Sequence, residues 1–375
     1  MASVAELQDS KKKLLRYQKK LDQLIESGKI RNYHDIVGDE EPSFLFPFIL
    51  SRLNYLLDSQ DKTDFSRKAI EKRKIFSDIV HKVGPAFLKT KQVFEDRAEL
   101  SGLPTGSLGK AFSPDAPVIY VANHGFHDDI LGTVLACDKH AYVMFASLPH
   151  FFNTVDGPLL YGNGVVLVNR KVKDSKKESL AKCKMVLENG CSIIIYPEGV
   201  WNKSPNQLAL PLWNGVYRLA EETGAMIVPI VHYIADPTYT TDKKSNPMHT
   251  VVDDPIDVKL LSQEEVLEKI KERFATWHYL MMEKYGKSTR EELIGSFATS
   301  QEAWEEQLRK RVQTADQYDS EIETSADYKS KSIITPYDVF APIANLPVTD
   351  KNIGEVAAAK RLVKEYTKND FQHRF

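Results

Sequence analysis

The stretch Val118-Ile119-Tyr120-Val121-Ala122-Asn123-His124 begins as an apolar, β-branched run and ends in two polar residues. A short apolar run of this kind is typical of a strand that is buried on both faces of a sheet. Asp129 follows five positions after His124 and opens an apolar segment, 129–137, that has the pattern of a helix. The sequence therefore predicts a strand, a turn and a helix, with an imidazole and a carboxylate at the turn.

Apolar runs and helix-like segments continue to alternate after this stretch. Further strands are predicted at 141–145, 164–168, 192–196 and 226–233, with an edge strand at 251–256. Further helices are predicted at 150–161, 174–189 and 211–223. This alternation predicts an α/β fold with a mixed, mostly parallel sheet and helices on both faces. Pro229 lacks a backbone N–H, so its strand is predicted to lie at an edge or to contain a bulge.

Helical patterns flank the α/β segment on both sides. Leucines repeat every seven residues within 5–28, and 64–100 is again helical in pattern. A loop rich in Gly, Ser and Pro begins at residue 101, and helical patterns return after 260. We therefore expect a helical N-terminal region at 1–100, an α/β domain at 101–260 and a helical C-terminal extension at 261–375.

The bulk composition excludes several classes of protein. The chain has 375 residues, a net charge of −2 and three cysteines without CxxC spacing, which argues against a nucleic-acid partner and a disulfide framework. Its first twenty residues lack the apolar segment of a secretory signal, and no apolar run is long enough to span a bilayer. We expect a cytoplasmic protein whose contact with membranes is peripheral. The apolar segment 44–50 is interpreted as core or as a segment that enters a bilayer interface.

The pair of His124 and Asp129 has the residue types that general-base catalysis needs. A neutral imidazole can accept a proton from a hydroxyl, and a carboxylate on its other nitrogen would fix the tautomer. The chain has no Gly-x-Ser-x-Gly nucleophile elbow, so the pair favours direct attack by a substrate hydroxyl. Two alternatives remain open, a histidine that only bonds backbone and a metal site formed with His127 and Asp128.

Two further turns carry candidate binding residues. Arg170 follows the predicted strand 164–168 and could hold a phosphate or a carboxylate through two hydrogen bonds. Glu198 lies in the turn Tyr196-Pro197-Glu198-Gly199 after the predicted strand 192–196. Ligands bind at the carboxyl ends of strands in open α/β sheets, so Glu198 could hydrogen-bond substrate hydroxyls there.

Taken in order, these segments resemble the glycerolipid acyltransferase family, the lysophosphatidate acyltransferase-like superfamily. The blocks of that family are Asn-His-x4-Asp, Gly-x5-Arg, Phe-Pro-Glu-Gly-Thr-Arg and Val-Pro-Ile. The matching segments are Asn123-His124 with Asp129, Gly164 with Arg170, Tyr196-Pro197-Glu198-Gly199 and Val228-Pro229-Ile230. Each block is weak alone, but the four match in both order and spacing over about residues 110–260.

The resemblance implies an O-acyltransferase of phospholipid biosynthesis that needs no metal and no bound cofactor. His124 would deprotonate an acceptor hydroxyl with Asp129 as its partner, and the hydroxyl would attack acyl-CoA or acyl-carrier protein as co-substrate. The remaining site residues would bind the acceptor: Asn123, Arg170, Glu198 and Gly199. The acceptor would be a glycerol phosphate, a lysophospholipid or a glycolipid at a membrane surface.

One segment departs from the family pattern. Val200-Trp201-Asn202 stands where the family often has Thr-Arg, so a second phosphate-binding arginine is missing there. Trp201 offers a stacking or interfacial surface instead, and Lys203 could restore the charge. This departure and the helical extensions keep two alternatives open: a non-catalytic lipid-binding protein, and an esterase or thioesterase in which the same pair activates water.

Overall fold

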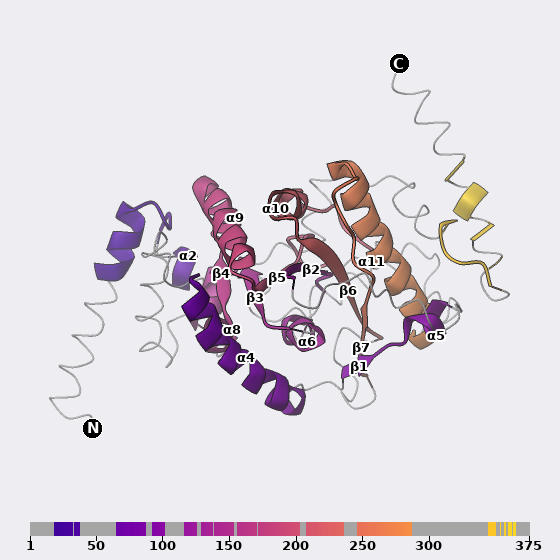
Figure 1. Cartoon of the computed structure of the whole chain (residues 1–375), viewed down its shortest axis with the longest axis horizontal. Helices are drawn as coiled ribbons and strands as arrows, with labels where there is room; N and C mark the ends of the chain where they lie inside the picture. Colours follow the sequence, from indigo (N-terminus) through magenta and orange to yellow (C-terminus); the bar gives the residue numbers. More distant parts are fainter. Residues whose placement is uncertain are drawn as a thin grey trace, which may run out of the picture. The chain divides into compact units, whose positions relative to one another are not determined.

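The computed structural model of the chain covers the predicted α/β segment and parts of both flanks (Figure 1). The described residues are 19–32, 34–37, 65–87, 92–101, 116–125, 129–137, 139–153, 156–170, 172–202, 208–235, 246–286, 344–349, 353, 356–357, 359–361 and 363–364. The apolar segment 44–50 and residues 287–343 of the expected helical C-terminal extension lie outside them.

The chain divides into two compact units. The first contains residues 1–80 and 139–193, and the second contains 81–138 and 194–375. Helix α4 (Arg67–Phe87) crosses the boundary between the units once, and strand β5 (Ser192–Ile195) crosses it again. These units are defined by their internal contacts, and the predicted domains 1–100, 101–260 and 261–375 stay a prediction.

The strands follow the order β1-β7-β6-β2-β5-β3-β4. Their bounds are β1 Gln92–Phe94, β2 Val118–Ala122, β3 Ala141–Phe145, β4 Val165–Leu167, β6 Met226–Ile234 and β7 Met248–Val252, with β5 as given above. In the second unit β1 and β2 run parallel to β7 and β6, whereas β6 and β7 are antiparallel. In the first unit β3 and β4 are parallel. The predicted α/β fold with a mixed, mostly parallel sheet is confirmed.

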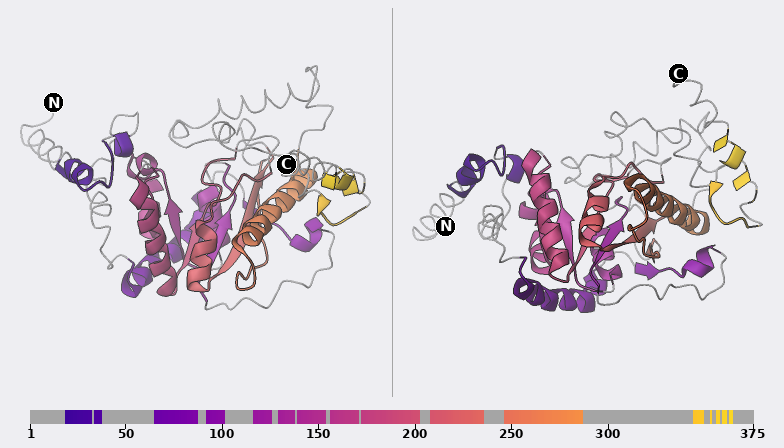
Figure 2. Two further views of the ribbon diagram at one scale, coloured as in Figure 1. Left: turned by 90° about the horizontal axis from the view of Figure 1, so that it is seen from above. Right: turned by 45° about the horizontal axis from the view of Figure 1, so that its top comes forward.

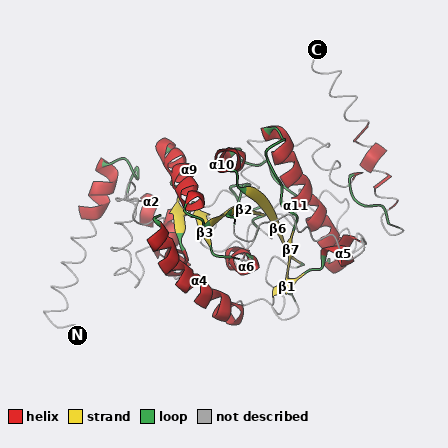
Figure 3. Ribbon diagram, viewed as in Figure 1, coloured by secondary structure: helices red, strands yellow, loops and turns green. Residues whose placement is uncertain are grey.

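Helices cover both faces of the strands within each unit (Figures 1 and 2). In the second unit α10 (Gly215–Thr223) and α11 (Gln263–Tyr285) lie on one face and α6 (Asp129–Ala136) on the other. In the first unit α9 (Lys173–Glu188) and α8 (Asp156–Asn163) lie on opposite faces. The shorter helices are α2 (His34–Val37), α5 (Arg97–Ser101) and α7 (Leu148–Asn153). Figure 3 distinguishes the helices from the strands by colour.

Strand β2 is buried on both faces and follows β6 in the strand order. All five of its residues are buried, as its uninterrupted apolar run predicts. Helix α11 packs against β6 through buried side chains that include Val266, Ile270 and Phe274. Its first turn is fixed by a capping box between Ser262 and Glu265. The carboxyl end of β2 is therefore held in a rigid surrounding.

Three predictions about the elements were wrong. Residues 92–94, expected within a helical region, form β1 because they pair with β7, and three residues are too few to show a strand pattern. The strand predicted at an edge, 251–256, is β7, which lies between β1 and β6. The helix predicted at 150–161 is divided into α7 and α8, because Pro158 lacks an N–H and is tolerated only in the first turn of a helix.

The edge alternative for Pro229 is wrong, because β6 is an interior strand, but the pairing is irregular beside it as a bulge requires: the register shifts by one residue between the Ile230–Val252 pair and the Ile227–Ile256 bridge. The last β6–β7 pair is Ile230 with Val252, and the Pro229 carbonyl accepts a hydrogen bond from the backbone N–H of Asp253. The N–H and carbonyl of one strand residue point to the same side. The missing donor of Pro229 therefore falls at the end of the β6–β7 ladder, where its loss costs little.

Candidate active site

His124 and Asp129 meet at the carboxyl end of β2. His124 is the second residue after the strand, and Asp129 is the first residue of α6. Their side chains are in contact, with His124 Nδ1 and Asp129 Oδ2 separated by 2.8 Å. The sequence prediction that a turn brings this imidazole and carboxylate together is thus matched by the geometry.

The environment of Asp129 fixes the orientation of the pair. Its side chain is fully buried, while that of His124 is 13% exposed. The same Oδ2 atom also accepts a hydrogen bond from the backbone N–H of Gly125 at 3.0 Å. An acceptor on Nδ1 selects the tautomer that carries its proton there, which leaves a lone pair on His124 Nε2. That nitrogen can therefore accept a proton from a substrate.

Glu198 ties the turn after β5 to the turn after β2. One of its carboxylate oxygens accepts a hydrogen bond from the backbone N–H of His124 at 3.3 Å, and the other accepts one from Leu210 at 2.8 Å. The side chain is fully buried, and burial raises its pKa to about 7 although these two hydrogen bonds oppose the shift. Glu198 thus lies beside the pair and holds the backbone that carries His124.

Gly199 is needed at its position for two independent reasons. Its φ of +69° lies in the left-handed region, which side chains other than glycine rarely adopt. A Cβ atom there would also lie 2.4 Å from Nε1 of Trp213. The indole of Trp213 is held over this turn, since its backbone N–H donates to the Pro197 carbonyl at 2.9 Å. Gly199 therefore shapes the turn that carries Glu198.

Two aromatic rings pack against the His124 imidazole. The Tyr196 ring centroid lies 4.5 Å from that of His124, and the Trp201 centroid lies 5.3 Å away in an edge-on arrangement. Trp201 is only 8% exposed, so its indole is a wall of the site, in accord with the predicted stacking role and not with an interfacial one. Apolar walls restrict the movement of the imidazole and exclude water from it.

A buried chain of hydrogen bonds lies behind the pair. His232 contacts Thr133 Oγ1 through Nε2 and Thr250 Oγ1 through Nδ1, both at 2.7 Å. Thr133 in turn donates to the Asp129 carbonyl at 2.8 Å and accepts from the Tyr196 hydroxyl at 2.9 Å. Burial lowers the pKa of His232 to about 4, so the ring is neutral and can donate through one nitrogen and accept through the other. This chain fixes the first turn of α6.

Asn123 joins β2 to β6 beside this chain. Its side-chain amide donates to the His232 carbonyl at 3.0 Å, and its carbonyl accepts from the His232 backbone N–H at 2.7 Å. The side chain is buried. In the structure Asn123 thus supports the strand from which His124 projects, and its predicted contact with substrate stays a prediction.

The second sequence block lies in the other compact unit. Arg170 is half-buried and follows β4. Gly164 precedes the same strand with a φ of +110°, and a Cβ atom there would lie 2.6 Å from the ring of Tyr142. The glycine of this block is therefore required by the backbone and by packing. The predicted anion-binding role of Arg170 stays a prediction, whereas the other five predicted site residues lie together in the second unit.

Metal and thiol chemistry find little support in the described part of the chain. No group of three His, Cys, Asp or Glu side chains within it is arranged to hold a metal ion. His127 and Asp128, on which the metal alternative depends, lie outside the described residues. The three cysteines are buried, and burial raises the pKa of Cys191 to about 12, so this thiol is a poor nucleophile.

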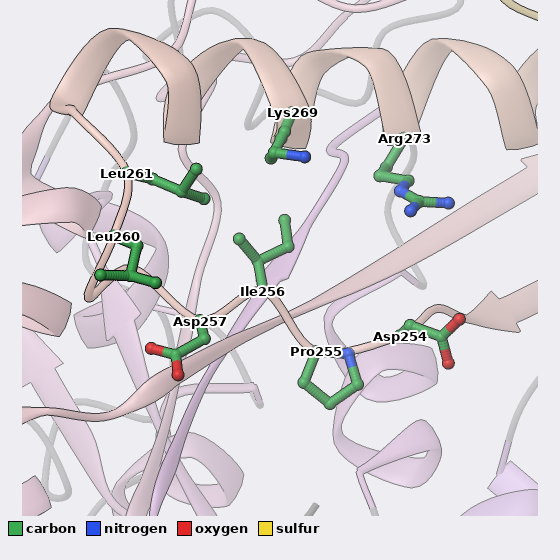
Figure 4. A pocket seen from close by; sticks show the side chains of 8 residues that line it. All are labelled: Asp254, Pro255, Ile256, Asp257, Leu260, Leu261, Lys269 and Arg273. Carbon is green, nitrogen blue, oxygen red and sulfur yellow. The ribbon is translucent and has the colours of Figure 1, made fainter. Parts of the chain in front are cut away.

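A surface pocket of about 330 Å³ lies elsewhere in the second unit, between α11 and the segment that precedes it (Figure 4). It is lined by apolar side chains such as Ile256 and by charged ones of both signs, including Asp257 and Arg273. None of the predicted site residues lines it. This pocket is therefore not the site at the end of β2.

The sequence did not predict that the Tyr196 ring packs against His124. Nor did it predict the hydrogen bonds that link Thr133 and His232. One signal was available, since His232 is a polar residue inside the apolar strand predicted at 226–233. A buried histidine there needs partners for both ring nitrogens. The sequence could not show which residues supply them.

Comparison with known proteins gives matches over the segment that carries the site. Residues 106–233 match the sequence model of the family described as Acyltransferase. A 1-acyl-sn-glycerol-3-phosphate acyltransferase of Brassica napus, described as chloroplastic, is 31% identical over 118 residues, which make up 32% of this chain and 33% of that protein. The human 1-acyl-sn-glycerol-3-phosphate acyltransferase beta is 30% identical over 130 residues, 34% of this chain and 45% of that protein.

The similarity concerns the part of the chain around the site. The match covers 33% of the length of the Brassica napus relative and 45% of the length of the human one. The crystal structure of PlsC, the 1-acyl-sn-glycerophosphate (LPA) acyltransferase from Thermotoga maritima, covers 73% of this chain and 100% of its own, with a TM-score of 0.40 and 18% identity. Among the described helices of this chain, none is long and apolar enough to cross a membrane.

Proposed function

Residues 106–233 belong to the glycerolipid acyltransferase family, and from this we propose that the chain is an O-acyltransferase. It transfers a fatty acyl group to a hydroxyl of a glycerol phosphate, lysophospholipid or glycolipid acceptor. The donor is acyl-CoA or acyl-carrier protein. The family suggested by the four sequence blocks is thereby confirmed, and the activity of the whole chain is the proposal.

The observation that carries the proposal is the contact between His124 Nδ1 and Asp129 Oδ2 at 2.8 Å. It leaves His124 Nε2 as the basic nitrogen at the end of β2, on a side chain that is 13% exposed. No serine or cysteine among the residues described around His124 is placed as its nucleophilic partner. The pair therefore suits activation of a hydroxyl that belongs to the substrate.

The reaction proceeds in two steps, and the proton that His124 accepts in the first step is returned in the second. His124 Nε2 accepts the proton of the acceptor hydroxyl while its oxygen attacks the thioester carbonyl carbon, forming a C–O bond and a tetrahedral oxyanion. The C–S bond then breaks, the carbonyl reforms, and the imidazolium returns the proton to the thiolate that leaves. Asp129 stabilises the transient positive charge on the imidazole. The chain itself is never acylated, and no metal or bound cofactor takes part.

The other site residues bind or position the reactants. Arg170 holds the anionic head group of the acceptor, and its guanidinium suits a phosphate through two hydrogen bonds. Glu198 and Gly199 shape the acceptor pocket, and Asn123 keeps His124 at the end of its strand. Because both oxygens of Glu198 accept backbone hydrogen bonds, its contribution runs through the backbone of the site.

The acceptor is a lipid or lipid precursor at a membrane surface, with which the protein associates peripherally. Trp201 occupies the place where the family often has its second arginine, and its buried indole lies against the His124 ring. With one cation fewer near the site, acceptors with less phosphate charge than lysophosphatidate become favoured. A neutral lysophospholipid or a glycolipid fits this surrounding.

An acceptor panel tests the proposal. Purified protein is incubated with labelled acyl-CoA or acyl-carrier protein and with glycerol 3-phosphate, lysophosphatidate, neutral lysophospholipids or glycolipids. We expect an acylated product with at least one acceptor, and no product with His124→Ala at matched protein concentration. Release of fatty acid without any dependence on acceptor would instead indicate an esterase or thioesterase. Lipid binding without turnover across the panel would indicate a non-catalytic protein.

A further inference from the structure

Helix α4 carries a stripe of large apolar side chains on its exposed side. Ile75, Ile79 and Val83 are 65%, 51% and 44% exposed. They are spaced four residues apart, which places them on one face of the helix. Three exposed, β-branched side chains in a row on a single helix are unlike the scattered apolar residues of an ordinary protein surface.

The stripe is not the face by which α4 packs on the protein. Ile70, Ser77 and Gly84 are buried, and they repeat every seven residues on another side of the helix. A Cβ atom on Gly84 would lie 3.0 Å from the Leu135 side chain, so this side is in close contact with its neighbours. The helix therefore has a packed inner face and a separate apolar outer face.

Lysines surround the outer face. Lys68, Lys72 and Lys82 are exposed and lie three or seven residues from Ile75 or Ile79, hence on the same side. The exposed residues of α4 include five basic side chains and two acidic ones, Glu71 and Asp78. Glu71 is paired with Arg67 at 3.5 Å, which offsets its charge. The apolar stripe thus lies within a basic surface.

We propose that this face of α4, defined by Ile75, Ile79, Val83 and the lysines 68, 72 and 82, docks on an anionic lipid bilayer. An interfacial helix places apolar side chains at the boundary of the acyl chains and lysines among the head groups. A protein partner fits less well, because the centres of protein interfaces are depleted in lysine and a stable one buries about 800 Å² on each partner. Three side chains cannot supply that area.

Vesicle co-sedimentation of the full chain tests the proposal independently of catalysis. Phosphatidylcholine vesicles are compared with vesicles that contain about 30% phosphatidylserine, at low salt and at about 0.5 M salt. We expect binding to the anionic vesicles only, and its loss at high salt. The double variant Ile75→Asp, Ile79→Asp and the double variant Lys72→Glu, Lys82→Glu should each lower the partition coefficient at least about tenfold.

Matched controls separate the stripe from general effects of exposure and charge. Leu260 is 96% exposed on a different segment, so Leu260→Asp removes an exposed apolar side chain without touching α4. Lys259→Glu with Lys269→Glu reverses two exposed lysines there. Both controls should bind like wild type, and circular dichroism should show that all variants are folded.

Three results would overturn the docking proposal. The first is unchanged vesicle binding by both α4 variants. The second is an equal loss of vesicle binding in the control variants. The third is a change of oligomeric state in the α4 variants without a change in vesicle binding. Transfer from a short-chain, water-soluble donor is measured in parallel. If vesicle binding depends on the α4 residues but no acyl transfer is found, the proposed function is contradicted and the docking proposal stands. If acyl transfer is found but vesicle binding is unchanged in the α4 variants, the docking proposal is contradicted and the proposed function stands.

Discussion

Glu198 accepts a hydrogen bond from the backbone N–H of His124 at 3.3 Å, across 74 positions of sequence. Its second oxygen accepts from Leu210 at 2.8 Å, so one buried carboxylate joins three separate segments. The turns after β5 and β2 are thereby coupled physically, because Glu198 in the first turn holds the backbone of His124 in the second. A substitution at Glu198 should therefore affect stability and catalysis together.

The Glu198→Gln variant tests this coupling through pH. Burial raises the pKa of Glu198 from 4.5 to about 7, so between these values the folded chain holds a proton that the unfolded chain has released. The contribution of this group to the free energy of unfolding is therefore fully present below pH 4.5 and is lost as pH rises to about 7. The loss amounts to roughly 3 kcal/mol. Urea denaturation from pH 4.5 to 8 should show this fall in wild type and a flatter profile in the variant.

The exposed residue Glu264 provides the control for that experiment. Glu264→Gln should keep the wild-type pH profile, since it leaves the buried Glu198 side chain in place. Identical profiles for wild type and Glu198→Gln would show that Glu198 is not the group that titrates.

Asp129→Asn should abolish most activity while the fold survives. A carboxamide can donate to His124 Nδ1, which favours the tautomer with the proton on Nε2 and removes the lone pair that accepts the substrate proton. We expect kcat to fall about 10²- to 10⁴-fold with little change in KM. Asp156→Asn is the matched control, because Asp156 lies 2.8 Å from His150 in a second His–Asp contact outside the site. A similar loss in both variants would contradict a specific role for Asp129.

Two substitutions of Tyr196 separate the contact of its ring with His124 from the hydrogen bond of its hydroxyl to Thr133. Tyr196→Phe keeps the ring against His124 and removes the hydrogen bond to Thr133, so the free energy of unfolding should fall by about 1 kcal/mol. Acyl transfer should stay within about threefold of wild type, since phenylalanine leaves the imidazole packed. Tyr196→Leu removes the aromatic wall, and transfer should fall roughly tenfold or more through kcat. Equal kinetics in the two variants would show that the ring does not position His124.

Much of the fold was predictable because its strongest signals are local. The apolar run at 118–121 predicted β2, and the alternation of strands and helices predicted the α/β class. The wrong predictions depend on partners far along the chain. Residues 92–94 are a strand only because β7 lies beside them, and the tolerance of Pro229 within β6 depends on where the β7 ladder ends.

In the site too, the local contact was predictable and the contacts between distant segments were not. His124 and Asp129 lie five positions apart at one turn, so their contact follows from a strand-to-helix pattern. The contact between Thr133 and His232 spans 99 positions and exists because α6 packs on β6. The contact between Glu198 and His124 depends on the strand order, which places β5 beside β2. Sequence spacing carries no information on either.

Single-turnover acyl transfer by wild type and His124→Ala, with donor and acceptor both saturating, tests the role of His124 as general base most directly. We expect the transfer rate to fall about 10²- to 10⁴-fold in the variant, the melting temperature to stay close to that of wild type, and no acylated protein to accumulate without acceptor. Transfer by His124→Ala at close to the wild-type rate, or a stable acyl-enzyme in the absence of acceptor, would contradict a general base acting on the substrate hydroxyl.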